Sequence, residues 1–187
     1  MADNAKTAAA SISGLKHLAT PRAKAKLAQL CGAGQPEYIR QMAIPALADL
    51  GDPAYCSTML DIARESHEYS RFIAVRAAGY LCGAKALPLI KSQLVSTNPS
   101  HRFEAAYALG DSHSRKAVSL LIPLLLDPDA NVRDAARNSL ATLAHRRAKR
   151  KQSAQETYRN WTSWWASHKT TAPIYSINAC SGPRPLP

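Results

Sequence analysis

An arginine recurs at one fixed interval along this chain of 187 residues. The four positions, each 31 residues after the last, are Arg40, Arg71, Arg102 and Arg133. An alanine lies three positions after each arginine, and further columns of small or apolar residues follow in the same phase. A period in this range marks a solenoid, in which each supersecondary unit buries its apolar face against its neighbours. The repeat therefore constrains the fold more than any other feature of the sequence.

One period, Arg102 to Gly110, shows that the repeating unit is helical. Its small and apolar residues recur at steps of three and four, the spacing of an α-helix. We expect a break at Gly110 to Ser112 and then a second apolar helix from Arg115 to Leu126. Alanines in the first helix allow close approach of backbones, and larger side chains in the second fill the space between layers. The sequence predicts an all-α fold.

The segment from Asp127 to Ala136, followed by Leu140, resembles a HEAT repeat, and more narrowly the short HEAT-like repeats described in phycobilisome lyases. The shared pattern is a Pro or Asp in the turn, then Val-Arg, then Ala at three-residue steps. Arg102 to Gly110 is similar to its second half. The resemblance covers residues 37–145 and implies a right-handed α-solenoid of about five helix-turn-helix repeats. Related repeats serve as assembly scaffolds, as lyase or chaperone subunits, and as the framework of a few enzymes.

Composition divides the chain into four segments. These are 1–36, a degenerate N-terminal repeat or cap; 37–145, the HEAT-like repeats; 146–170, a basic and Trp-rich C-terminal capping helix; and 171–187, a disordered Pro-rich tail. In the first segment we expect a helix from about Lys6 to Leu18, a turn at Thr20-Pro21, and a helix to Leu30.

The positive charge lies at the two ends of the chain. The formal net charge of +11 divides into +4 over residues 1–36, zero over 37–143, and +7 over 144–187. A partner attracted by charge would therefore meet the ends before the repeats.

The cysteines and the N-terminus indicate a cytoplasmic protein. Cys31, Cys56, Cys82 and Cys180 have no CxxC spacing and no His at ligand spacing, so we expect neither a disulfide nor a zinc site. Cys56 shares a column with Leu87 and Val118, which predicts a small buried apolar residue. The first residues carry no secretory signal, and no segment approaches the roughly 20 apolar residues of a membrane span.

The arginine column has two interpretations. Stacked helices lie about 8–10 Å apart, so the guanidinium groups could form a ladder that binds phosphates. Alternatively each arginine binds turn carbonyls or an acid of a neighbouring repeat and fixes the stacking. Because the column recurs in every clear unit, the framework interpretation is favoured.

A basic run precedes a group of aromatic residues near the C-terminus. Its members are Arg146, Arg147, Lys149, Arg150 and Lys151. Tyr158, Trp161 and Trp165 follow on one helical stripe. Basic residues beside aromatic ones are typical of nucleic-acid sites, but rings on one helical face usually pack, and a basic face can simply be solvated. We therefore expect the aromatic residues to cap the last repeat, and leave the basic run open as a phosphate-binding site.

Enzyme templates find no match. The sequence lacks a Gly-rich phosphate loop, an HExxH motif and a GxSxG elbow. His101 and Glu104 are spaced as metal ligands can be, but no second pair supports them. HEAT-like DNA glycosylases use Trp and Tyr across successive repeats, whereas all three Trp here fall in one terminal helix. We expect no catalytic residues, no metal and no cofactor.

The sequence therefore predicts a non-catalytic scaffold or adaptor that binds a protein partner on its concave face. By period, and with an orientation implied by the family resemblance, the binding side chains are Asp61, Arg64, Lys91, Ser92, Lys116 and Ser119. The first alternative is a nucleic-acid-binding protein, including a DNA-repair-like one, that uses the basic run. A lyase or chaperone subunit is a further alternative, implied by the family resemblance alone.

Overall fold

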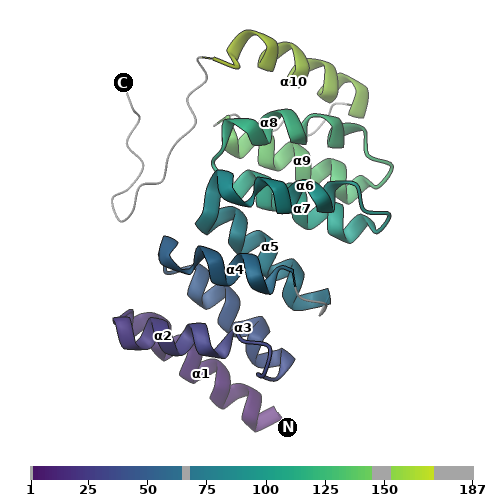
Figure 1. Ribbon diagram of the computed structural model, residues 1–187. Helices are drawn as coiled ribbons and strands as arrows, with labels where there is room; N and C mark the ends of the chain where they lie inside the picture. Colours follow the sequence, from purple (N-terminus) through teal and green to yellow (C-terminus); the bar gives the residue numbers. More distant parts are fainter. Residues whose placement is uncertain (1, 65–67, 145–152, 171–187) are drawn as a thin grey trace. The chain divides into compact units, whose positions relative to one another are not determined.

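The computed structural model describes residues 2–64, 68–144 and 153–170, and within these ranges it contains helices and no strand (Figure 1). The predicted all-α fold is confirmed. The chain divides into two compact units, Met1–Cys82 and Gly83–Pro187.

The first unit is a stack of helix pairs. Its elements are α1 (Ala2–Leu18), α2 (Pro21–Leu30), α3 (Glu37–Ala48), the 3-10 turn η1 (Pro53–Tyr55), α4 (Cys56–Ile62) and α5 (Glu68–Cys82). Helix α3 packs against both α1 and α5, and α2 and α4 contact α3 and α5 respectively. The side chain of Thr20 caps α2 by accepting a hydrogen bond from the backbone N–H of Ala23, and Pro21 occupies the first turn. The turn predicted at Thr20-Pro21 is therefore present.

The second unit is likewise built of packed helices. Its elements are η2 (Gly83–Ala86), α6 (Leu87–Leu94), α7 (Pro99–Asp111), α8 (Arg115–Leu121), η3 (Pro123–Leu126), α9 (Ala130–Leu143) and α10 (Ala154–His168). Helices α7 and α9 form its central contact, α6 and α8 pack on α7, and η3 packs on α9. Helix α10 packs on η3, so it covers the end of the last helix pair (Figure 1).

The sequence columns form the core. The alanines three positions after the arginines are fully buried, and the members of the next apolar column are equally inaccessible: Ala43, Ala74, Ala105, Ala136, Leu47, Ala78, Leu109 and Leu140. From the second helices, Met59, Ile90 and Leu121 are also fully buried. Small residues where first helices meet, and large ones beneath the second helices, produce the close packing that the periodicity predicts.

The second helix of the repeat that contains Arg102 is shorter than predicted. Helix α8 ends at Leu121, and Pro123–Leu126 follows as the 3-10 turn η3 instead of continuing the helix to Leu126. Proline has no backbone N–H to donate and its ring crowds the preceding turn, which favours the end of the α-helix before Pro123. The apolar pattern spans the whole segment because Leu124 and Leu125 are still buried in η3.

Gly110 does not break the first helix, as the sequence suggested, but lies inside α7. A Cβ added at this position would lie 2.8 Å from the Cβ and 3.1 Å from the Cα of Ser139 in α9. The glycine therefore permits the close contact between α7 and α9. The left-handed backbone conformation that follows the helix falls instead on His113, with φ of 47°.

Replacing Gly110 by alanine tests this contact. Alanine favours a helix over glycine by about 1 kcal/mol, but overpacking costs about 1–3 kcal/mol, so we expect Gly110→Ala to lower the free energy of unfolding by about 1 kcal/mol. Urea unfolding followed by circular dichroism measures the change. Gly14→Ala is the control, because Gly14 lies in α1 with no heavy atom within 4 Å of an added Cβ, and there alanine should stabilise. The double variant Gly110→Ala/Ser139→Gly should recover stability; an unchanged Gly110→Ala variant would contradict the account.

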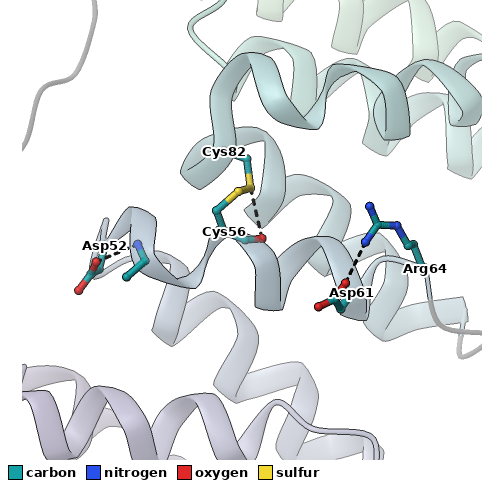
Figure 2. The surroundings of a disulfide bond; sticks show 6 residues. Asp52, Cys56, Asp61, Arg64 and Cys82 are labelled. Atoms are coloured by element: carbon teal, nitrogen blue, oxygen red, sulfur yellow. Dashed lines mark hydrogen bonds and ion pairs between the residues drawn. A yellow bond between two sulfur atoms is a disulfide. The ribbon is translucent and has the colours of Figure 1, made fainter.

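Cys56 and Cys82 form a disulfide, so the expectation of unpaired cysteines was wrong (Figure 2). Cys56 begins α4 and Cys82 ends α5, and because these two helices pack together their Cα atoms are 5.1 Å apart. Both residues are half-buried, so Cys56 is not the fully buried apolar residue predicted from its column. Cys31 is free and buried, and burial raises the pKa of its thiol to about 12.

One apolar stretch meets the length and composition of a membrane span, contrary to the expectation that no segment would. It runs from Tyr69 to Leu94, and more than half of its most apolar window is buried inside the protein. It is not a continuous α-helix, because Gly83 adopts φ of 53° and the chain passes through η2. Burial and interruption are the features of core helices, and they account for its apolar composition.

Candidate binding surfaces

Arg102 is bound on all sides by its own repeat and the following turn. Its Nε and Nη2 donate to the two carboxylate oxygens of Asp127 at 2.7 and 2.8 Å, a bidentate ion pair. Its Nη1 donates to the carbonyls of Ser96 and Thr97, six and five residues earlier, at 2.8 and 3.2 Å. All three nitrogens of this guanidinium are thus engaged within the protein, and four of its five N–H donors are used.

Asp127 connects two repeats. Its carboxylate accepts the Arg102 pair and the backbone N–H of Asp129, while its carbonyl accepts a hydrogen bond from Arg133 Nη1 at 2.7 Å. Burial by itself would raise the pKa of this carboxyl group. The hydrogen bonds from Arg102 and Asp129 and the charges of Arg102 and Arg133 outweigh it, so the pKa lies below its ordinary value. Asp127 is therefore ionised and structural at neutral pH.

The other column arginines follow the same rule with local differences. Arg133 donates to the carbonyls of Asp127 and Pro128, again six and five residues earlier. Arg40 is 1% exposed and donates from Nε to the carbonyl of Cys31, nine residues earlier. For Arg71, the carbonyls six and five residues earlier belong to residues 65 and 66, which lie outside the described ranges; its Nε is buried with no partner among the described residues. Three of the four column arginines, Arg40, Arg102 and Arg133, are therefore framework, as the recurrence indicated.

The six side chains predicted to bind a partner are all exposed. Asp61 lies in α4 and Arg64 just after it, and the two form an ion pair at 2.8 Å (Figure 2). In the second unit, Lys91 and Ser92 lie on α6, while Lys116 and Ser119 lie on α8. Because α6 and α8 both pack on α7, these four residues project from second helices whose opposite sides are buried.

The aromatic residues of α10 make intramolecular contacts. Trp161 is buried and meets Trp164 edge to face, with ring centroids 5.4 Å apart. His168 stacks on Trp164, and the guanidinium of Arg115 lies 5.7 Å from the ring centroid of Trp165. Arg115 also donates to the carbonyl of His168 at 2.9 Å, tying α8 to the end of α10. The capping role expected of residues 146–170 stays a prediction. The basic run, Arg146, Arg147, Lys149, Arg150 and Lys151, lies outside the described residues.

A cavity of about 700 Å³ lies in the second unit where α10 begins. Its walls come from η3 and the turn after it, from one face of α9, and from the first turn of α10. Arg133 and Arg137, one helical turn apart, provide its positive charge, and Leu126 provides an exposed apolar side chain. This cavity could not be predicted from the sequence because it depends on how α10 packs, although the spacing of Arg133 and Arg137 places them on one face of a helix.

Among residues 2–64, 68–144 and 153–170, no three His, Cys, Asp or Glu side chains are grouped to hold a metal ion.

The repeats identify the family. Residues 57–141 match the family model for HEAT repeats. This segment belongs to the HEAT-repeat family. The matched HEAT repeats run from the first residues of α4 almost to the end of α9 and include three of the four column arginines. No curated relative matches the chain. The narrower likeness to phycobilisome-lyase repeats stays a prediction.

The ion pair of Asp127 predicts a pH-dependent variant. The folded-state pKa of Asp127 lies below the unfolded value, so its stabilisation is complete above about pH 4 and is lost as the pH falls through the folded pKa. We expect Asp127→Asn to lower the free energy of unfolding by about 3 kcal/mol at pH 7, because the largely buried Arg102 loses its carboxylate. The difference should shrink in acid, where the natural Asp127 is protonated.

Tryptophan fluorescence in urea measures this difference, since all three Trp lie in α10 of the second unit. Asp134→Asn is the control: Asp134 is 60% exposed and pairs with Arg137, so its loss should cost under about 0.5 kcal/mol. A gap between natural chain and Asp127→Asn that stays constant from pH 7 to pH 3 would show that the carboxylate charge is not the cause.

Proposed function

We propose that this chain is a non-catalytic HEAT-repeat scaffold that binds a protein partner through the exposed side of its second helices. HEAT repeats commonly act as interaction scaffolds and are generally not catalytic. The observation that supports this surface is that the column arginines described above form hydrogen bonds within the protein. Because Arg40, Arg102 and Arg133 bind their own backbone turns, the phosphate ladder is not available, and the exposed polar side chains of α4, α6 and α8 remain.

The chemistry of this surface suits a polar partner of mixed charge. Asp61 and Arg64 neutralise each other in the first unit, whereas Lys91 and Lys116 are positive in the second. Exposed lysine and serine side chains contribute to specificity and association rate more than to affinity. We infer that an acidic stretch of a folded or extended partner would contact Lys91 and Lys116, with serine hydroxyls as hydrogen-bonding groups.

Cross-linking tests this surface. The natural full-length chain captures its partner from an extract of the cells that make it, and an amine-reactive cross-linker is applied. We expect cross-links at Lys91 and Lys116, and at least about a tenfold loss of captured partner with Lys91→Glu/Lys116→Glu, because opposite charges become like charges. Lys6→Glu is the matched control, since Lys6 is an exposed lysine of α1, a first helix, outside this surface. Equal capture by the reversed-charge variant would refute the surface.

Nucleic-acid binding through the basic run remains the alternative, and the same material distinguishes it. Five phosphate contacts should give a log–log salt slope of about −4. Fluorescence polarisation with labelled RNA and DNA at two salt concentrations measures the slope. Binding that is lost when Arg146, Arg147, Lys149, Arg150 and Lys151 become Gln, but kept in Lys91→Glu/Lys116→Glu, would support the alternative over the protein scaffold.

A further inference from the structure

We propose that the cavity beside the start of α10 is a second docking site, for a short peptide segment in which an acidic residue adjoins an aliphatic one. This goes beyond the proposed scaffold function, because the cavity is built from η3, α9 and α10 and shares no residue with the exposed side of α6 and α8. A test of this second site is therefore independent of a test of the scaffold surface.

The charged side chains that line the cavity are two aspartates, Asp127 and Asp134, and two arginines, Arg133 and Arg137. Asp127 is already paired with Arg102, which lies outside the lining, and Arg137 pairs with Asp134, while Arg133 donates to two carbonyl oxygens of the turn. Because Asp127 is neutralised by Arg102, the two lining arginines suit a single carboxylate better than a phosphate with two charges.

Arg137 supplies the strongest indication of a missing partner. Its side chain is 19% exposed, and its Nε is buried with no hydrogen-bond partner among the described residues. A buried donor left without an acceptor is costly, and the Nε–Nη2 edge of a guanidinium is shaped for the two oxygens of a carboxylate. Asp134 accepts a hydrogen bond from Nη2 and is 60% exposed, so an incoming carboxylate can displace it at little cost.

The apolar wall explains why the acidic residue should have an aliphatic neighbour. Leu126 is 46% exposed although the residues around it in η3, Leu124 and Leu125, are buried. It lies on the same cavity as the two arginines, together with Pro128 and Ala154. An aliphatic side chain placed there would remove apolar surface from water on both partners.

A peptide fits this cavity better than a nucleic acid. Among the described residues no aromatic side chain lines the cavity, so bases would have nothing there to stack on. The carboxylates of Asp127 and Asp134 lie in its walls and would repel successive phosphates. A volume of about 700 Å³ accommodates two or three side chains of an extended peptide.

Selection from a library of random 12-residue peptides displayed on phage tests the site with the full chain as bait. We expect recovered peptides to place Asp or Glu within two positions of Leu, Ile or Val. Synthetic labelled copies should then bind Arg137→Gln and Leu126→Lys each about tenfold more weakly than the natural chain, because one variant removes the charged fork and the other the apolar contact. Leu126→Lys changes an exposed position, so it keeps the test valid if Arg137→Gln unfolds; circular dichroism checks both.

Lys91→Glu/Lys116→Glu separates the two surfaces. If the peptides bind this variant as tightly as the natural chain, the cavity is the site, whatever becomes of the scaffold surface. Peptides that lack an acidic-aliphatic pair, or that bind Arg137→Gln and Leu126→Lys unchanged, would overturn the assignment. A different result would be that a 20-nucleotide single-stranded DNA competes fully with the peptides and binds Arg137→Gln more weakly than the natural chain. That result would identify the ligand as a nucleic acid and would also overturn the peptide assignment.

Discussion

The carboxylate and carbonyl of Asp127 join three parts of the second unit: α7, the turn after η3, and α9. Asp127 lies 25 residues after Arg102 and six before Arg133, so one residue contacts two arginines that are one period apart. Arg102 repeats the second half of this arrangement with the carbonyl of Ser96. The fixed interval in the sequence therefore reflects a repeated hydrogen bond, in which an arginine near the start of a first helix donates to a carbonyl of the turn before it.

This constraint also decides where binding can take place. A guanidinium that satisfies buried carbonyls and a carboxylate cannot serve a ligand without exposing those groups, which is costly. Both proposed binding surfaces therefore use residues outside this framework: the exposed side chains of the second helices, and the cavity beside α10 with Arg137, which is not a member of the column.

The sequence predicted those features that are repeated and local. The arginine and alanine columns identified the helices and the core, and Thr20-Pro21 marked a helix start. Features that depend on distant contacts were missed. Gly110 was predicted to end its helix, because the contact with Ser139 that requires a glycine lies in the next repeat. Pro123 ends a helix whose apolar pattern continues past it. The Cys56–Cys82 disulfide was missed because motif spacing ignores antiparallel packing of α4 on α5. The cytoplasmic location expected from the sequence stays a prediction.

A double-mutant cycle on Arg102 and Asp127 tests the framework role of the column most directly. The free energies of unfolding of the natural chain, Arg102→Met, Asp127→Asn and the double variant would be measured in urea at pH 7 by tryptophan fluorescence. The structure predicts a coupling energy of about 2–3 kcal/mol, because either single change leaves a buried partner unsatisfied. Additive effects, with a coupling below about 0.5 kcal/mol, would show that the pair does not hold the repeats together and would return the column to the candidates for ligand binding.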